Sequence, residues 1–594
     1  MTFTPPLREI AFALTEIAGA RRLQQTHPGF DDETLTAVLD AGGRLARDVL
    51  APLNRAGDEI GARIENGRVR AVPGFAEAYR AFAEGGWNAL AADPDHGGQG
   101  LPKALEIAVY EMMHSANMAF GLCPMLTQGA IEALSAHGTE RQKTLYLPKL
   151  VSGEWTGTMN LTEPQAGSDL AALRTRAEPD GNGFYRLTGQ KIFITWGDHD
   201  MADNILHLVL ARMPGAPDGT RGVSLFLSAK RLVGDDGTLG AANDLGPTGI
   251  EHKLGIHASP TCVMVYGDAE GAKAWRVGEE NRGLAAMFVM MNAARLAVGT
   301  QGVAIGERAY QQALSYARER RQGRGMNGGD GMSPIIEHAD VQRMLMTMKA
   351  NVQAARGICC LTGVSLDLSD HAHAAGERTA AANRAALLTP IAKAFSTDIG
   401  DEATSIGVQV HGGMGFIEET GAAQHMRDSR IAAIYEGANG IHGIDLVQRK
   451  LPLANGETVR DEIAGIRRVA SDVAGRGGAD FGATAERLAE ASDALEESTR
   501  LMLDWAAADP YSALAGASPY LRLFGLTLGG ACLAKAGLAA EALAEGGDRG
   551  ELGRVGLARF FAEKLAVAAP GLARAIASGG APLQSYETIL KDSA

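Results

Sequence analysis

The sequence contains few cysteines, and none of them are paired at a spacing that favours a metal site. Its five cysteines are Cys123, Cys262, Cys359, Cys360 and Cys532, and no two form a C-x-x-C pair. Small metal-binding and redox modules depend on such pairs. We therefore expect no bound metal, and we expect a reduced chain inside the cell, where disulfides are rare.

Positive charge is also scarce. The chain has 56 Lys and Arg residues against 70 Asp and Glu residues, which gives a formal net charge of -14. Proteins that bind nucleic acid carry a broad basic surface. This balance argues against a nucleic-acid partner and requires any anionic ligand to be bound by a local cationic pocket.

A long apolar run is missing as well. The most apolar late stretch, Leu523–Ala534, is bounded by Arg522 and Lys535 and is shorter than the ~20 residues of a membrane span. It predicts a buried helix and no membrane span. The first residues, MTFTPPLREI, lack the basic-then-apolar order of a secretory signal, so we expect a cytoplasmic protein.

The 594 residues are enough for several domains of roughly 100–200 residues each. Apolar residues recur every three or four positions from Asp31 to about Leu150 and again after Gly283, which is typical of helices. Between Trp155 and Asp268, short apolar runs alternate with Gly, Asp and Pro, as strands and turns do. We predict a mainly α fold with a central β-domain. The predicted domains are an N-terminal helical domain (1–154), a middle β-domain (155–280), a helical bundle (281–453) and a C-terminal helical extension (454–594).

The strongest local motif is the segment Asn160–Asp169, which reads NLTEPQAGSD. Pro, Gly, Ser and Asp are common turn formers, so an ordinary loop explains the segment about equally well when it is taken alone. A binding function uses the same features, because Gly167 permits close approach of a ligand to the backbone. The hydroxyl groups of Thr162 and Ser168 and nearby N–H groups can bind a polar heterocycle or a phosphate.

A single glutamate stands in the segment Ala432–Ile441, which reads AAIYEGANGI. A lone Glu before Gly is usually a solvated residue. However, a general base that removes a weakly acidic proton requires a carboxylate in an apolar, dehydrated site. Glu436 lies between Ile434-Tyr435 and a turn of small residues, which fits that requirement.

Three further segments support a binding or catalytic function for these motifs, because of the order in which they occur along the chain. They are Gly189–Thr195 (GQKIFIT), Tyr316–Gln322 (YARERRQ) and Gln409–Phe416 (QVHGGMGF). The basic residues of the second segment have an ordinary explanation, since they complement the dipole at the end of a helix. Taken together with the two segments above, and in this order, these segments resemble the motifs of the acyl-CoA dehydrogenase family.

The resemblance implies an acyl-CoA dehydrogenase fold, in which the middle β-domain is barrel-like, followed here by an extra helical domain. It implies FAD as cofactor, an acyl-CoA as substrate, electron-transferring flavoprotein as electron acceptor, and a homo-oligomer, either a dimer or a tetramer. Glu436 is expected to take the α-proton while the β-hydrogen leaves as hydride to the flavin.

Individual binding residues follow from the same resemblance. Thr162 and Thr195 are expected to lie against the isoalloxazine ring, and Arg320 is expected to reach the pyrophosphate of FAD in a neighbouring subunit. The expected FAD-binding residues are Met159, Leu161, Thr162, Gly167, Ser168, Phe193, Ile194, Thr195, Arg320, Gln322, His338, Gln409, Gly412, Gly413 and Ala438. The expected substrate-binding residues are Ser168, Asn292, Arg295, Tyr435 and Glu436.

Some positions leave a second explanation open or differ from the family pattern. Arg295 is explained equally well as a buried structural cation that a carboxylate satisfies. Ala438 stands where many members have Thr, so one hydroxyl contact to the flavin is absent. Gly440 stands where others have Gln.

The segments around Glu436 (IYEGANGIHGIDL) and at Lys253–Thr261 (KLGIHASPT), together with the extension, are similar to a bacterial subgroup that oxidises 3-(methylthio)propionyl-CoA. We expect this substrate, with short straight-chain acyl-CoAs also accepted. The alternatives are a broad-range medium- or long-chain acyl-CoA dehydrogenase, an acyl-CoA oxidase and, outside the enzymes, a non-catalytic flavin- or CoA-binding scaffold.

Overall fold

The computed structural model describes residues 3–181, 183–325, 331–476 and 478–591. The chain divides into two compact units. We call residues 2–5 and 41–297 the β unit, and residues 1, 6–40 and 298–594 the helical unit. Helix α8 (Gly283–Glu319) runs through the division, because its first residues belong to the β unit and those from Val298 on belong to the helical unit.

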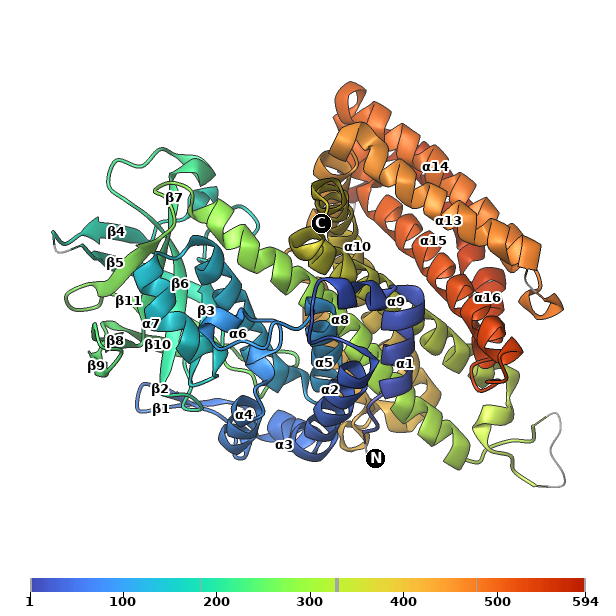
Figure 1. Ribbon diagram of the computed structural model, residues 1–594, viewed down its shortest axis with the longest axis horizontal. Helices are drawn as coiled ribbons and strands as arrows, with labels where there is room; N and C mark the ends of the chain where they lie inside the picture. The colour runs from blue at the N-terminus through green and yellow to red at the C-terminus, as the bar shows by residue number, and fades with distance from the viewer. Residues whose placement is uncertain (1–2, 182, 326–330, 477, 592–594) are drawn as a thin grey trace. The chain divides into compact units, whose positions relative to one another are not determined.

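The β unit combines helices with a sheet (Figure 1). Its helices are the end of α2 (Asp32–Arg44), α3 (Ala51–Ile60), α4 (Phe75–Glu84), α5 (Lys103–Ala116), α6 (Met118–His137), α7 (Glu140–Val151) and the start of α8. Its strands are β1 (Arg63–Glu65), β2 (Arg68–Arg70), β3 (Trp155–Asn160), β4 (Arg176–Pro179), β5 (Tyr185–Thr195), β6 (Asn204–Arg212), β7 (Val223–Ala229), β8 (Arg231–Val233), β9 (Leu239–Ala242), β10 (Leu245–Ile250), β11 (Thr261–Tyr266) and β12 (Ala272–Val277).

The main sheet has eight strands and closes on itself. Its order is β10-β11-β5-β12-β7-β6-β3, and β4 pairs with both β5 and β6. The pairing β5-β12-β7-β6-β4 therefore returns to β5. A small barrel closes in the same way, and side chains fill its interior. Leu187, Val209 and Phe226 are fully buried in this core. The predicted β-barrel-like centre of the fold is confirmed.

One part of the N-terminal region differs from the helical prediction. Strands β1 and β2 form an antiparallel hairpin within the segment expected to be helical. Its turn is Asn66-Gly67, and both residues have a positive φ, 51° and 72°. Asn-Gly favours the type of tight turn that joins two strands, so the sequence contained a hairpin signal that the helical periodicity around it obscured.

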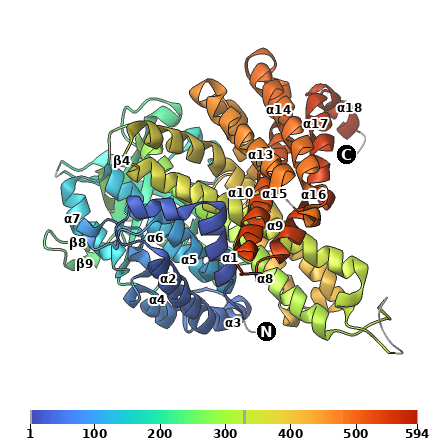
Figure 2. The same cartoon turned by 45° about the vertical axis from the view of Figure 1, so that its right-hand side comes forward.

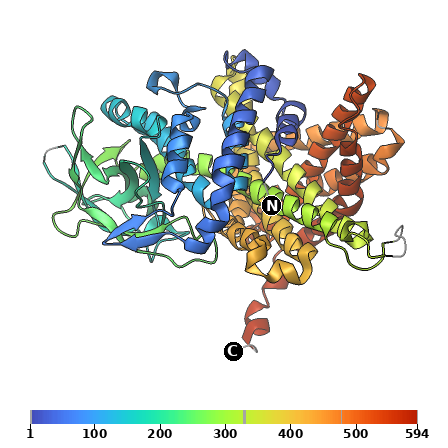
Figure 3. The ribbon, with the colours of Figure 1, turned by 90° about the horizontal axis from the view of Figure 1, so that it is seen from below.

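The helical unit is built from helices of very different length (Figures 2 and 3). They are α1 (Leu7–Phe12), the first residues of α2, the end of α8, α9 (Ala339–His371), α10 (Ala375–His411), α11 (Ala422–Ser429), α12 (Asn439–Asp445), α13 (Glu457–Arg476), α14 (Thr484–Ala508), α15 (Pro510–Glu545), α16 (Gly553–Lys564), α17 (Ala569–Ala577) and α18 (Tyr586–Lys591). The longest of them are α9, α10 and α15.

Helices α8 and α10 approach each other closely through glycines. A Cβ atom added to Gly299 would lie 2.5 Å from the carbonyl oxygen of Ala392, and one added to Gly302 would lie 2.2 Å from that of Ser396. Backbones can come this close only where side chains are missing. This contact fixes the part of α10 that faces the candidate active site described below.

The C-terminal extension packs on the same helices. The guanidinium group of Arg384 on α10 donates two hydrogen bonds to the carboxylate of Glu462 on α13, at 2.7 and 3.0 Å. Helix α15 lies against α9, α10 and α12, and a Cβ on Gly525 would lie 2.3 Å from the ring of Phe395. The extension therefore shares its interior with the helices from Val298 on.

The expected buried helix around Leu523–Ala534 is confirmed, but it is longer than the apolar run, because α15 continues for 36 residues. Helices α8 and α15 are long and apolar enough to cross a membrane by length and composition alone. In α15, 83% of the most apolar window is buried inside the protein, which is typical of a core helix.

Candidate active site

Glu436 lies in a turn with an unusual backbone. Its φ is 52° and that of the following Gly437 is 90°. A left-handed conformation is uncommon outside glycine, and such residues cluster at functional sites. A Cβ on Gly437 would also lie 3.0 Å from the Nε2 atom of His442. The turn thus requires glycine at position 437, whereas the glutamate at position 436 is not explained by the backbone.

The turn itself is half-buried at Glu436 and exposed at Ala438, but side chains that contact it lie in the interior. Nε2 of His442, whose side chain is 1% exposed, lies 3.1 Å from the carbonyl oxygen of Glu436. The hydroxyl group of Tyr435 donates a hydrogen bond to Gln301 of α8, which is also fully buried. Burial raises the pKa of Tyr435, and the nearby Glu436 raises it further, so this phenol stays protonated.

In the β unit, the segment that follows β3 is held by a buried ion pair. Glu163 is 3% exposed, and its carboxylate lies 2.8 Å from the ammonium group of Lys191, which is fully buried. The same carboxylate accepts hydrogen bonds from the backbone N–H groups of Arg174 and Thr175 and from the Thr175 hydroxyl. Burial favours the neutral acid, but Lys191 and these donors hold the pKa of Glu163 well below its usual value.

This ion pair positions the predicted flavin segment. Lys191 also donates to the carbonyl oxygen of Leu161, and the N–H of Ile192 donates to that of Thr162, both at 2.9 Å. Thr162 is half-buried, while Gly167 and Ser168 are exposed. A Cβ on Gly167 would meet no atom within 4 Å. The loop after Thr162 therefore offers open space beside a fixed backbone.

Strand β5 contains a bulge at the second predicted flavin segment. Ile192 and Phe193 together oppose the single residue Val263 of β11. Phe193 has a φ of 59° and is 58% exposed. Bulges next to binding sites redirect side chains, and here the bulge directs a large aromatic ring outward. The hydroxyl-bearing Thr195 follows two residues later.

Two of the predicted FAD-binding residues of the β unit point into its interior. Met159 is 7% exposed and Ile194 is 2% exposed. A cofactor would therefore meet mainly their backbone atoms.

The structure brings three predicted residues together at the end of α8. Arg320 and Gln322 are exposed, and their side chains lie 3.4 Å apart. Nε2 of His338 lies 2.8 Å from the carbonyl oxygen of Gln322. This group carries a cation and several donors at a surface.

Gln409, Gly412 and Gly413 lie at the end of α10, and all three are exposed. Neither glycine has an atom within 4 Å of an added Cβ. The next residues expose large apolar side chains, with Met414 at 49%, Phe416 at 86% and Ile417 at 45%. Several large apolar side chains exposed close together in the sequence indicate an interaction site.

The two predicted substrate residues of α8 are neighbours in the β unit. Nη1 of Arg295 lies 3.5 Å from Oδ1 of Asn292, and its guanidinium group lies 5.7 Å from the centre of the Phe288 ring. Arg295 is 9% exposed, whereas Asn292 is exposed. Ala438, beside Glu436, is exposed as well.

Two residues that support these segments were missed from the sequence. Lys191 lies inside a predicted motif, but a lysine in a strand gives no sign that it is buried. Lys393 lies on α10, and its Nζ atom donates to the carbonyl oxygen of Gly437 at 2.7 Å. The helix that carries it is apolar around that position, and this was the only available signal.

The chain matches four family models in succession. They are the N-terminal domain (32–154), middle domain (158–269) and C-terminal domain (281–451) of acyl-CoA dehydrogenases and an acetyl-CoA dehydrogenase C-terminal-like domain (458–586). The last of these models covers the extension.

Similar proteins match nearly the whole chain. A 3-methylmercaptopropionyl-CoA dehydrogenase of Ruegeria pomeroyi is 47% identical over 96% of both chains. A butyryl-CoA dehydrogenase of Syntrophomonas wolfei is 35% identical over 93% of both. The structure of an acyl-CoA dehydrogenase complexed with FAD from Bacillus anthracis has the same fold, with a TM-score of 0.74, 21% identity, and coverage of 98% of this chain and 94% of that one. The predicted fold and family are confirmed: the chain belongs to the acyl-CoA dehydrogenase family of FAD-dependent oxidoreductases.

Proposed function

We propose that this protein oxidises 3-(methylthio)propionyl-CoA to methylthioacryloyl-CoA, with Glu436 as the base. The Cα–H bond of the thioester breaks, and its proton goes to the Glu436 carboxylate. When bound, FAD supplies the oxidant that accepts the β-hydrogen with its electron pair. The substrate thus loses two hydrogens and gains a Cα=Cβ bond.

The geometry of the Glu436 turn carries the assignment of the base. The half-buried Glu436 has a left-handed backbone, and its backbone carbonyl lies close to the buried His442, so the position from which its side chain projects is fixed. Proton abstraction needs this, because the base must lie within hydrogen-bond reach of the proton that it takes. A solvated surface glutamate would not need two consecutive positive φ angles.

The residues of the chain fit FAD. The exposed Phe193 at the bulge of β5 and the hydroxyl groups of Thr162 and Thr195 suit a planar heterocycle with polar edges. At the end of α8, the guanidinium fork of Arg320 suits phosphate oxygens. We infer that these residues, with Gln322, His338 and Gln409, hold the cofactor.

We further infer a homo-oligomer in which Arg320 binds the cofactor of a neighbouring subunit. The apolar residues Met414, Phe416 and Ile417 beside the Gly412–Gly413 turn support a subunit contact there, and such contacts usually close into a symmetric dimer or tetramer.

The variant Arg320→Ala is expected to lose FAD without losing its oligomeric state. It lacks a charge-assisted hydrogen bond worth roughly 1.5–3 kcal/mol, so FAD occupancy after gel filtration at low FAD should fall. The ratio of absorbance at 450 and 280 nm measures occupancy, and light scattering measures the oligomer. Arg324→Ala, a neighbouring exposed arginine, is the control. Full occupancy in Arg320→Ala, or an FAD-loaded active monomer in the wild type, would contradict the proposal.

If the proposed substrate is correct, kcat/KM should differ little between thioesters with short acyl chains. A thioether resembles a methylene in size and polarity, and one methylene in an apolar pocket discriminates by about 1–3 kcal/mol. Butyryl-CoA should therefore be oxidised as well, but less efficiently than 3-(methylthio)propionyl-CoA. The measurement is kcat/KM for these two thioesters and for octanoyl- and palmitoyl-CoA with one electron acceptor. A long-chain preference of more than about 100-fold, roughly 2.7 kcal/mol, would instead favour a broad-range dehydrogenase.

We infer a cytoplasmic enzyme that passes its electrons to an electron-transferring flavoprotein. An oxidase would instead pass them to oxygen. Flavin reduced by substrate and then exposed to air distinguishes the two, because slow reoxidation with little peroxide supports the dehydrogenase.

A further inference from the structure

Lys393 is a buried cation directed at the turn that carries Glu436. It lies on α10 and is 0% exposed. Its ammonium group donates to the carbonyl oxygen of Gly437 at 2.7 Å and to Oδ1 of Asn439 at 2.8 Å. Burying an ammonium group is costly unless it is well hydrogen-bonded, and these two hydrogen bonds go to residues one and three positions after Glu436.

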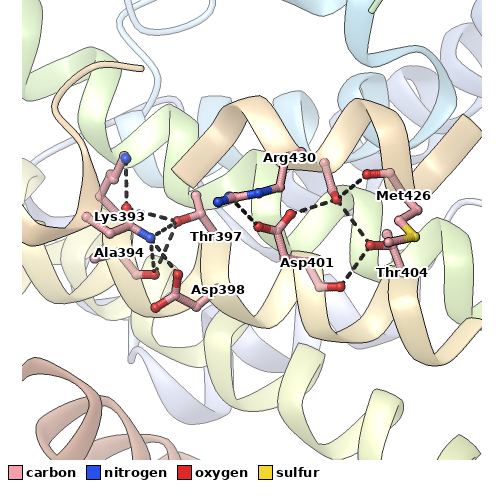
Figure 4. Close-up of polar contacts among 10 residues, drawn as sticks. Lys393, Ala394, Thr397, Asp398, Asp401, Thr404, Met426 and Arg430 are labelled. Atoms are coloured by element: carbon pink, nitrogen blue, oxygen red, sulfur yellow. Dashed lines mark hydrogen bonds and ion pairs between the residues drawn. The ribbon is translucent and has the colours of Figure 1, made fainter. Parts of the chain in front are cut away.

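Asn439 continues the connection to α10. Its Nδ2 atom donates to Oδ1 of Asp398 at 2.7 Å, to the Thr397 hydroxyl at 3.0 Å and to the carbonyl oxygen of Ala394 at 3.2 Å. Figure 4 shows Lys393, Ala394, Thr397 and Asp398 along one helix, with the polar contacts on one side of it. Residues three and four apart share a helix face, so a single face of α10 holds the turn.

These contacts fall where the backbone is strained. Glu436 and Gly437 are both left-handed, and such a conformation costs of order 1–3 kcal/mol at a non-glycine residue unless its surroundings enforce it. The backbone carbonyl groups of both residues have a partner. His442 lies close to the carbonyl oxygen of Glu436, and Lys393 donates a hydrogen bond to that of Gly437. The contacts therefore oppose relaxation of the turn.

Burial also affects the acid in this group. It raises the pKa of Asp398, an effect that the hydrogen bond from Asn439 partly offsets. Asn439 thus separates the Lys393 ammonium from the Asp398 carboxyl and is bonded to both, which sets the orientation of its amide group.

We propose that Lys393 and Asn439 are positioning residues for the catalytic base: Lys393 on α10 and Asn439 at the start of α12, which is hydrogen-bonded to α10, fix the turn Glu436-Gly437-Ala438 so that the carboxylate of Glu436 is aimed at the substrate. This inference rests on the proposed role of Glu436. Neither residue transfers a proton, and each acts through the backbone of the turn.

The test is Lys393→Met, which keeps a long apolar side chain but cannot donate. A displacement of about 1 Å at a reacting group costs roughly 100-fold in rate, so the rate constant for flavin reduction should fall by about 10- to 100-fold. The exchange of the substrate α-hydrogen with D2O should fall by a similar factor. FAD content and the apparent dissociation constant for the thioester should not change.

Lys535→Met is the control for loss of a lysine–carbonyl hydrogen bond away from the turn, at an exposed lysine. Lys535 also donates to a backbone carbonyl oxygen of the helical unit, that of Ile17, at 2.7 Å, so its loss reports the general effect of removing such a bond. It should leave reduction and exchange at the wild-type rate. A rate constant per bound FAD that is unchanged in Lys393→Met would overturn the proposal.

Asn439→Ala provides a second test if Lys393→Met does not fold, and the same loss of rate at constant FAD content is expected. The double variant should be no slower than the slower single variant, because both act on one turn. Glu436→Gln in the same experiment separates the two hypotheses. If it reduces flavin normally, the proposed base is wrong, whereas if it is inactive while Lys393→Met and Asn439→Ala are normal, only the positioning role is wrong.

Discussion

Glu436→Gln will retain its yellow colour when an acyl-CoA is added. An amide cannot accept the α-proton, and the loss of one general base typically lowers the rate by about 10²–10⁴-fold. The side chain keeps its size, so the turn at Gly437 and the bound FAD should be preserved. Stopped-flow absorbance at 450 nm measures the rate of bleaching, and the flavin absorbance before mixing measures FAD content.

The control for this experiment is Glu545→Gln, a glutamate exposed at the end of α15, which should bleach at the wild-type rate. Wild-type bleaching in Glu436→Gln would refute the assignment. Slow bleaching accompanied by loss of FAD would instead indicate that Glu436 is needed for cofactor binding.

Lys191→Met will lower the stability of the β unit. It leaves the Glu163 carboxylate, 3% exposed, without its counterion, and breaking a buried ion pair on one side costs about 3–5 kcal/mol. The loop after β3 loses the hydrogen bond to Leu161 as well, so FAD should be released more easily. Thermal unfolding followed by circular dichroism, together with flavin fluorescence as a measure of released FAD, checks both effects.

The double variant Lys191→Met/Glu163→Gln is the control, because it removes the unpaired charge. It should be more stable than Lys191→Met alone; equal or lower stability would contradict the electrostatic explanation. The stability of the wild-type protein should also depend on pH. The folded-state pKa of Glu163 is depressed, so its contribution is present above its unfolded pKa, about 4.3, and is lost as the pH falls below that value. The double variant should lack this part of the acid sensitivity.

Much of the fold follows from local patterns. The runs at Lys191–Thr195 and Ile205–Leu210 are strand residues, in β5 and β6, and the apolar stretch at Leu523–Ala534 is a buried helix. The order of five motifs identified the family. The bounds of the four domains and the roles of the individual site residues remain predictions.

Other features depend on contacts that no local pattern records. Lys393 and Gly437 are separated by 44 residues, and the lysine is buried only because α10 packs against the turn. The left-handed φ of Glu436 likewise follows from its surroundings, since glutamate does not favour it. The hairpin at Asn66-Gly67 did have a local signal, and it was missed because helical residues lie on both sides.

The close contact between α12 and α15 couples the conformation of the turn that carries Glu436 to the folding of the last helices. A Cβ on Gly443 of α12 would lie 3.1 Å from the carbonyl carbon of Ala517 on α15, and α12 begins three residues after Glu436. Local unfolding of α15 therefore also removes the surface against which α12 packs. Within the helical unit, the extension and the proposed base should gain and lose hydrogen-exchange protection together, as one cooperative unit of folding.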